Sequence, residues 1–231
     1  MPSINLLYVA HELYMKRIAI IGPPGAGKTT LAKELALILG IKACHLDRLF
    51  WQRGWKGKTG DTRIDILQNF VLRNEWIIEG TYLRSSGPRL EAADTIIFLD
   101  IPPFLCLQRI IKRHWEHYGP TRRDIPEGCK DRLTLFRMLK VLTFPLSERR
   151  KLEKNLRIYE SGEHETKRVI RLHSDEEVKA FLAEQQNVLN KVTPAKESPP
   201  GSSGAMNVSK EKMVPFTPPP QTCTRSSVRC G

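Results

Sequence analysis

Residues 17–30 read RIAIIGPPGAGKTT, and this stretch decides the fold class of the 231-residue chain. The run from Arg17 to Ile21 is short and β-branched, which predicts a buried strand. The segment from Gly22 to Thr29 satisfies the GxxxxGKS/T pattern, and residues 29–39 have helical spacing that ends at Gly40. A strand before the glycine-rich loop and a helix after it are the context in which this pattern binds phosphate.

The glycine-rich loop predicts a nucleoside triphosphate site. Glycine lets the backbone approach phosphate oxygens closely, and the amides at the start of the next helix supply partial positive charge. In this pattern Lys28 reaches the β- and γ-phosphates, and the Thr29 hydroxyl binds Mg²⁺. We expect ATP and Mg²⁺ as cofactors, because the chain has no NKxD motif for guanine. The predicted nucleotide-binding residues of the loop are Gly22, Pro23, Pro24, Gly25, Ala26, Gly27, Lys28, Thr29 and Thr30.

Strand and helix patterns alternate along the rest of residues 15–190. Further strands are predicted over residues 41–45, 76–79, 95–100 and 167–172. Further helices are predicted over residues 61–73, 87–93 and 103–117, and after Ser174, whose spacing to Glu177 is that of a capping box. Such alternation indicates an α/β fold, in which helices cover both faces of a parallel sheet.

Composition limits the class of protein. Hydrophobic residues make up 40% of the chain, which is typical of a globular protein. The net charge of +12 favours anionic partners such as nucleotides, phosphorylated metabolites or DNA. No apolar run approaches the roughly 20 residues of a membrane span, and no signal peptide pattern is present, so we expect a cytoplasmic protein that does not contact a membrane. The five cysteines contain no CxxC pair, and His114, His117 and Cys129 lack a fourth zinc ligand.

The sequence predicts three segments. Residues 1–14 precede Met15 and are either an N-terminal extension or a short surface helix. Residues 15–190 form a P-loop domain of the kinase type. Residues 191–231 are rich in Pro and Ser and hold six Lys or Arg and two Glu, a net charge of +4, which predicts a disordered basic tail.

Arginines that follow the predicted strand 95–100 indicate a lid at about residues 115–130. Arg109 and Arg113 are four residues apart on one helix, and Arg122 and Arg123 follow in a loop. Phosphoryl transfer depends on charge neutralisation, so we expect these four arginines, with Lys28, to be catalytic. The alternatives are a solvated basic helix with an ordinary loop, or a surface that grips the phosphates of DNA.

The chain resembles the FlaR-like DNA topology modulation proteins, an adenylate-kinase-like family of P-loop proteins. The resemblance covers roughly residues 15–183 and is carried by HLDRLFW (45–51), WIIEGTY (76–82), RLEAADTIIFLD (89–100) and TRRDIPEGC (121–129). It implies a nucleoside or nucleotide kinase fold: a five-stranded parallel sheet in the order 2-3-1-4-5, with helices on both faces and an arginine-rich lid. It does not imply a particular substrate.

Further site residues follow from where related kinases bind the acceptor. Asp47 follows the second strand and either orients or deprotonates an acceptor hydroxyl, binds water on Mg²⁺, or caps a helix. Arg48 either pairs with an acceptor phosphate or is a surface residue. Trp51, with Trp55, either forms an apolar wall for the acceptor or packs within a small lobe that is inserted after the second strand.

The end of the third strand supplies a second group. Glu79 stands where the family pattern WIIDGNY has Asp, and we expect it to bind Mg²⁺ through water. Gly80 permits close approach of a ligand, and Arg84 or Arg89 either grips an acceptor phosphate or pairs with a nearby carboxylate, Glu91 or Asp94. At the ends of the later strands, Asp100 either binds metal or caps the next helix, and His173 either borders the base or is a surface residue.

The sequence thus predicts an ATP- and Mg²⁺-dependent phosphotransferase that acts on a small acceptor, such as a nucleoside or nucleotide. The alternative is a P-loop ATPase that binds DNA through the basic lid and tail and modulates its topology. The phosphotransferase hypothesis predicts a nucleoside triphosphate and an unidentified small molecule as partners of the protein. The alternative adds DNA as a partner.

Overall fold

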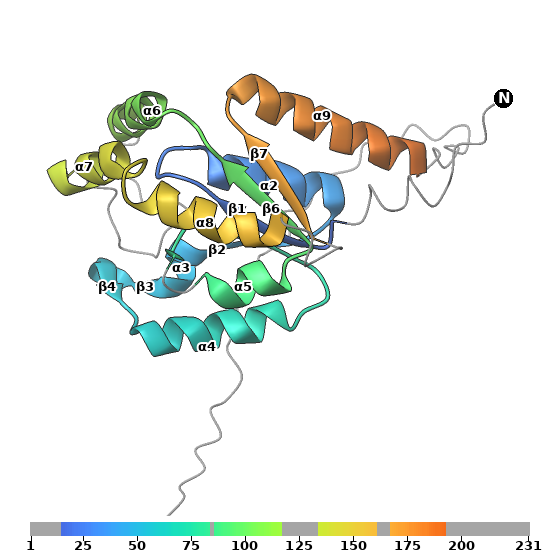
Figure 1. The fold of residues 1–231 in the computed structure, drawn as a ribbon, viewed down its shortest axis with the longest axis horizontal. Helices are drawn as coiled ribbons and strands as arrows, with labels where there is room; N and C mark the ends of the chain where they lie inside the picture. Colours follow the sequence, from blue (N-terminus) through green and yellow to red (C-terminus); the bar gives the residue numbers. More distant parts are fainter. Residues whose placement is uncertain (1–14, 84–85, 117–133, 161–166, 193–231) are drawn as a thin grey trace, which may run out of the picture. The chain divides into compact units, whose positions relative to one another are not determined.

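Five parallel strands form the centre of the protein. The computed structural model describes residues 15–83, 86–116, 134–160 and 167–192, all within one unit of the chain, Met1–Ala195. The strands lie in the order β2-β5-β1-β6-β7, and each neighbouring pair is parallel (Figure 1). Their bounds are β1 (Arg17–Ile21), β2 (Ala43–His45), β5 (Trp76–Glu79), β6 (Thr95–Leu99) and β7 (Arg168–Leu172). The predicted sheet order 2-3-1-4-5 is confirmed.

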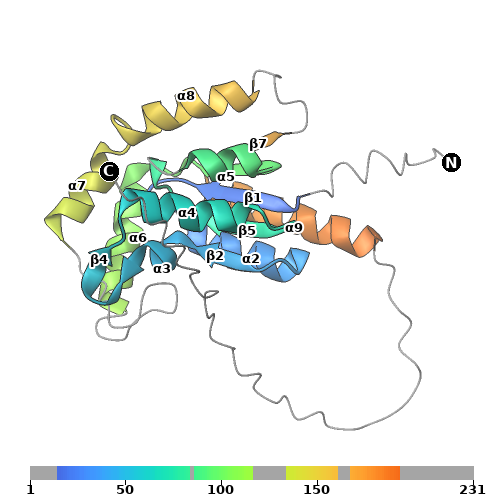
Figure 2. The ribbon, with the colours of Figure 1, turned by 90° about the horizontal axis from the view of Figure 1, so that it is seen from below.

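Helices cover both faces of this sheet. The β1 side chains alternate, so that Ile18 and Ile20 join one buried cluster while Ala19 and Ile21 join the other. The first cluster packs under α2 (Lys28–Leu39), α6 (Pro103–Glu116) and α9 (Asp175–Val192). The second packs under α4 (Gly60–Val71), α5 (Gly87–Ala92) and α8 (Glu148–Glu160), which lie on the opposite side (Figure 2). The predicted α/β class, with helices on both faces, is confirmed.

Local signals for the ends of helices agree with the structure. Helix α2 ends at Gly40, whose φ of 70° is left-handed. At the start of α9 the Ser174 hydroxyl accepts a hydrogen bond from the Glu177 amide (3.2 Å). The Glu177 carboxylate accepts from the amide of His173 (2.8 Å), one residue earlier than in a standard capping box. The bounds of the predicted elements differ from the observed ones by at most two residues.

Six elements were not predicted. Some of them are too short to show a period of hydrophobic residues. These are helix α3 (Leu46–Phe50) and a hairpin of β3 (Trp51–Gln52) and β4 (Lys56–Gly57), whose strands are joined by the 3-10 turn η1 (Arg53–Trp55). Helix α8 buries only Leu152 and Leu156 in a mainly charged segment, and α7 (Leu135–Thr143) precedes it. Together α7 and α8 connect the region of the predicted lid to β7.

Several predictions fall on residues outside the described ranges. These are the N-terminal extension (1–14), Arg84, most of the lid with Arg122 and Arg123, His117, Cys129 and the basic tail from residue 193. Within the described ranges, every helix is too short or too polar to cross a bilayer.

Candidate phosphotransfer site

The glycine-rich loop (Gly22–Thr29) connects the carboxyl end of β1 to the start of α2. Gly22 and Gly25 have φ values of 150° and 86°, which side chains rarely allow. A Cβ atom at Gly22 would lie 2.5 Å from the Leu99 carbonyl oxygen, and one at Gly25 would lie 2.4 Å from that of Cys106. These two glycines therefore let the loop pack against β6 and α6.

Replacing Gly25 with Ala should destabilise the protein. The left-handed φ and the overlap with the backbone of Cys106 are together expected to lower the free energy of unfolding by about 2–4 kcal/mol. Urea denaturation measures this change. Gly87→Ala is the matched control, because a Cβ atom there meets nothing within 4 Å. Equal stability of the two variants would contradict this account of the loop.

Lys28 lies across the loop that precedes it. Its Nζ donates hydrogen bonds to the carbonyl oxygens of Gly22 (2.9 Å) and Pro23 (2.8 Å). Burial lowers the pKa of Lys28, while the negative charges of Glu79 and Asp47 oppose this shift. The lysine therefore lies close to one carboxylate at the end of β5 and to another in α3.

Glu79 connects the first turn of α2 to the end of β2. Its Oε1 accepts hydrogen bonds from the Thr29 hydroxyl (3.1 Å) and from His45 Nδ1 (2.9 Å). Burial alone would raise the pKa of Glu79, but the His45 hydrogen bond and the charge of Lys28 outweigh it and hold that pKa below its usual value. Glu79 is thus an ionised, buried carboxylate in a fixed position.

Thr29 and Glu79 fit a magnesium site in the chemistry of their donors. Both offer hard oxygen atoms, which Mg²⁺ prefers, and they already lie within hydrogen-bonding distance of each other. Across the described ranges, no group of three or more His, Cys, Asp or Glu is arranged to hold a metal ion. Magnesium bound here would therefore take most of its ligands from phosphate and water, as it commonly does.

On the other side of Lys28, an aromatic pair holds Asp47. The Tyr82 hydroxyl donates a hydrogen bond to Asp47 Oδ1 and accepts one from Trp51 Nε1 (2.7 Å). Burial raises the pKa of Tyr82, so that its hydroxyl stays protonated and donates to the carboxylate. The helix-capping alternative for Asp47 is wrong, because the cap of α3 is His45 and Asp47 lies in the first turn.

Arg89 is buried against the segment that follows β5. It is fully buried and donates a hydrogen bond to the Thr81 carbonyl, while the Thr81 hydroxyl donates to the carbonyl of Gly22. Burial lowers the pKa of Arg89 to about 10. The predicted alternative of a pair with Asp94 is wrong, because Asp94 Oδ2 accepts from the amides that begin β1 instead, those of Lys16 (3.2 Å) and Arg17 (2.7 Å).

The other predicted acceptor residues surround this region. Arg48 is exposed on α3. The rings of Trp51 and Trp55 meet edge to face, with their centroids 5.7 Å apart. Gly80 has a φ of 134°, and a Cβ atom there would lie 3.0 Å from that of Leu46. The structure therefore brings Trp51, Gly80 and Asp47 to one side of Lys28, with Arg48 at the surface.

Two α6 arginines face the glycine-rich loop. Arg109 Nη1 lies 3.5 Å from the Ala26 carbonyl oxygen, and its Nη2 pairs with Asp175 at 2.5 Å. Arg113 lies close enough to Lys28 to lower its pKa. The four-residue spacing in α6 thus places both side chains on the phosphate side of the site.

Asp100 and His173 lie at the carboxyl ends of β6 and β7. Asp100 Oδ2 accepts a hydrogen bond from Arg149 Nη2 (2.7 Å), so an ion pair to α8 replaces the predicted helix cap. His173 Nε2 lies 4.0 Å from the same oxygen, and its Nδ1 lies 3.3 Å from Glu177. About half of the His173 side chain is exposed. That His173 borders the base of a nucleotide stays a prediction.

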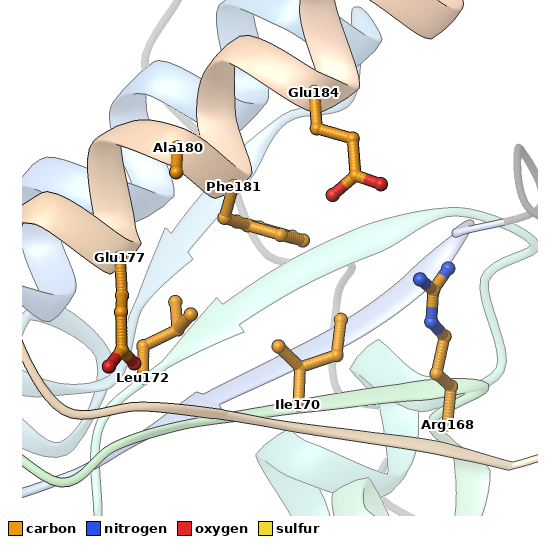
Figure 3. A pocket seen from close by; sticks show the side chains of 7 residues that line it. All are labelled: Arg168, Ile170, Leu172, Glu177, Ala180, Phe181 and Glu184. Atoms are coloured by element: carbon orange, nitrogen blue, oxygen red, sulfur yellow. The ribbon is translucent and has the colours of Figure 1, made fainter.

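A separate cavity of about 500 Å³ lies between β7 and α9 (Figure 3). Apolar side chains of Ile170, Leu172 and Phe181 line its middle, and Arg168 and Glu184 lie at one end. Its lining includes none of the predicted site residues, which lie instead around Lys28 and Glu79.

Sequence reasoning missed His45, Arg63, Thr81, Tyr82 and Arg149. His45 and Tyr82 are each within three residues of a predicted site residue, so the motifs HLD and EGTY could have drawn attention to them. Arg63 and Arg149 carry no local signal, because each meets its partners only through the fold.

Comparisons with known proteins give a partial match. Over 99 residues the chain is 34% identical to a Pyrococcus furiosus protein named "Putative adenylate kinase". The matched segment makes up 42% of this chain. The chain spans about half the length of that curated relative, 54%. No family model matches the chain, so the FlaR-like resemblance stays a prediction.

Solved structures give only loose matches. The chain is 20% identical to shikimate kinase from Acinetobacter baumannii in complex with shikimate, over 80% of this chain and 96% of that one, with a TM-score of 0.46. The chain is 19% identical to shikimate kinase from Bacteroides thetaiotaomicron, over 76% of this chain and 99% of that one, with a TM-score of 0.43. It is 14% identical to a sugar kinase from Janibacter sp., over 77% of this chain and 93% of that one, with a TM-score of 0.39. At these TM-scores the likeness is too loose to assign an activity.

Proposed function

We propose that the protein transfers the γ-phosphoryl group of ATP, with Mg²⁺, to a hydroxyl group of a small acceptor. The observation that carries the proposal is the position of Asp47, a carboxylate that Tyr82 fixes through a hydrogen bond and whose negative charge acts on Lys28. A hydrolytic enzyme can also use a carboxylate to activate water, but it does not need aromatic side chains around that carboxylate. Such a group does suit a hydroxyl that must lose its proton.

In this reaction an acceptor oxygen forms a bond to the γ-phosphorus while the bond from that phosphorus to the β–γ bridging oxygen breaks. The acceptor proton passes to Asp47 Oδ2, since Oδ1 already accepts from Tyr82. Lys28, Arg109 and Arg113 neutralise charge on the phosphates. ADP and the phosphorylated acceptor leave, and Asp47 returns the proton to solvent.

The Thr29 hydroxyl and, through water, the Glu79 carboxylate would hold Mg²⁺. When bound, the ion offsets charge on the β- and γ-phosphates. His45 donates to the same Glu79 oxygen that accepts from Thr29, and this second hydrogen bond restricts the carboxylate, so that it does not need to reorganise during the reaction. Glu is one methylene longer than the Asp of the family pattern, and the His45 hydrogen bond compensates by restricting it.

The similarity to the Pyrococcus furiosus protein supports this proposal and favours a nucleoside or nucleotide as the acceptor. The aromatic pair of Trp51 and Trp55 offers apolar surface beside Asp47, which suits the flat part of such a molecule.

The test is ADP formation from Mg-ATP by the full-length protein. Nucleosides, nucleoside monophosphates, cyclic hydroxy acids and supercoiled DNA are added in separate reactions, with EDTA as the metal-free control. Stimulation by one class of small molecule, with a phosphorylated product detected by mass spectrometry, is the expected result. Stimulation by DNA alone would overturn the proposal and support the predicted DNA-binding ATPase instead.

A further inference from the structure

An exposed row of leucines runs along α7 and the turn that follows it. The four side chains, which we call the leucine stripe, are Leu135 (72% exposed), Leu139 (50%), Leu142 (48%) and Leu146 (67%). Their spacing of four, three and four residues places them on one face of a helix. The helical path continues past the end of α7, because the Ser147 amide donates to the Thr143 carbonyl four residues earlier (3.1 Å).

The leucine stripe is a second apolar face of α7, separate from the face that packs on the core. Val141 and Phe144 lie on the other side of the helix, are buried, and join the two core clusters. Helix α7 itself lies at the outside of the fold beside α6 (Figures 1 and 2). The core therefore leaves the stripe in contact with solvent.

Other exposed leucines of the described chain do not form such a row. Leu37 on α2 and Leu72 after α4 are each more exposed than any member of the stripe. Neither has another exposed large apolar residue within four positions in the sequence, in ranges that the structure describes. Single exposed leucines are ordinary at a protein surface, whereas a contiguous apolar row indicates a contact with another molecule.

The spacing of the stripe is the same when it is read in either direction. If two α7 helices run antiparallel about a two-fold axis, Leu139 of one copy therefore lies opposite Leu142 of the other. In the same arrangement Leu135 lies opposite Leu146. A two-fold interface uses one patch twice, so that patch must be complementary to itself, as this one is. Alternating spacings of three and four are also those by which packed helices interlock their side chains.

The border of the stripe is uncharged, which favours a second copy over an anionic membrane. Met138 and Thr143 flank the stripe by helical geometry, and neither carries a charge. Lys140 lies further round the helix, and its ammonium group pairs with Glu148 (3.6 Å). A helix that binds a bilayer has free Lys or Arg on the polar side of its apolar face, where they meet lipid headgroups. The uncharged border suits an equally uncharged border on a second copy.

We propose that the leucine stripe is the contact surface of a homodimer, in which α7 of one copy packs antiparallel against α7 of the other about a two-fold axis. Removal of the exposed leucines from water drives the association. An interface centred on three helical turns is small, so the dimer forms at micromolar concentrations of the protein. None of the four leucines belongs to the candidate phosphotransfer site, and the contact does not depend on that reaction.

Sedimentation velocity of the full-length protein across the micromolar range tests the contact. At the highest concentrations the wild type should sediment with twice the mass of one chain. Leu139→Glu places a charge at the centre of the contact and should raise the dissociation constant by at least about 30-fold. Leu37→Glu is the matched control, because it changes an exposed leucine of another helix, and it should leave the dissociation constant unchanged. Circular dichroism checks that both variants fold.

Mixed variants test the antiparallel arrangement. Leu139→Glu and Leu142→Lys should each be largely monomeric alone, and a mixture of the two should recover the dimer, because their opposite charges face each other across the axis. A mixture of Leu139→Glu with Leu139→Lys should not recover it. If Leu139→Glu does not fold, Leu139→Lys with Leu142→Glu makes the same comparison with the charges exchanged.

A wild type that is monomeric at every concentration, or a dimer with the same dissociation constant in Leu139→Glu, would overturn this inference. Recovery of the dimer by Leu139→Glu with Leu139→Lys would overturn the antiparallel arrangement in favour of a parallel one. Vesicles of phosphatidylserine and phosphatidylcholine provide the last comparison. A monomeric wild type that binds them, with binding lost in Leu139→Glu and kept in Leu37→Glu, would overturn the homodimer and assign the stripe to a membrane.

Discussion

Lys28→Ala protein is expected to transfer phosphoryl groups about 10²–10³-fold more slowly than the wild type, because it loses the cation that stabilises charge developing on the phosphates. The loss should appear in kcat/KM for both substrates, measured as ADP formation with the best acceptor. Lys33→Ala is the matched control, since Lys33 is exposed on the same helix. Lys28→Arg keeps the charge but not the shape, and only partial activity is expected.

The fold should survive this change. Burial lowers the pKa of Lys28, so the folded state binds its proton less tightly than the unfolded state does. The charged lysine therefore disfavours folding at pH values below its unfolded pKa, and its removal relieves that effect at neutral pH. A melting temperature no lower than that of the wild type, together with the lost activity, is the expected combination. Full activity in Lys28→Ala would refute the phosphate-binding role.

The second large effect is expected for Asp47→Asn. Asparagine can still accept the hydrogen bond from Tyr82, but it cannot take a proton from an acceptor hydroxyl. We expect kcat to fall about 10²–10⁴-fold, the usual contribution of a general base, with little change in the acceptor KM. Steady-state kinetics with varied acceptor at saturating Mg-ATP separates the two constants.

Tyr82→Phe provides the comparison for Asp47→Asn. It removes the hydrogen bond to Asp47 but keeps the carboxylate and the ring that contacts Arg63. Its kcat should fall about tenfold or less, the effect of losing one hydrogen bond of roughly 1–1.5 kcal/mol. If Asp47→Asn instead raised the acceptor KM and left kcat unchanged, Asp47 would bind the acceptor without removing its proton.

The fold was predictable because its signals are local. The strand, loop and helix from Arg17 to Leu39 follow one another directly, and alternating patterns identify the other strands of the sheet. The alternation along β1, in which both faces are buried, indicates helices on both sides. The hairpin at Trp51 has two residues in each strand, and no period can be read from so few residues.

The site was predictable only in part, because its contacts join residues that are far apart in the chain. The motif identified Lys28 and Thr29, but the partner of Thr29 lies 50 residues later, at Glu79. His45 and Tyr82 appear beside predicted residues without any pattern of their own. The predicted role of Arg89 toward an acceptor phosphate stays a prediction, since the fold buries this residue against Thr81 but leaves its Nε and Nη1 without hydrogen-bond partners in the described part of the chain.

Two carbonyl oxygens of the glycine-rich loop accept from more than one donor. The Gly22 oxygen accepts from Lys28 and from the Thr81 hydroxyl, and the Pro23 oxygen accepts from Lys28 and from the Ala26 amide (3.2 Å). When Lys28 turns toward a phosphate, each oxygen therefore keeps a partner, and no backbone group is left unsatisfied. Under the proposed function, Lys28 can therefore bind a phosphate without leaving either carbonyl oxygen of the loop unpaired.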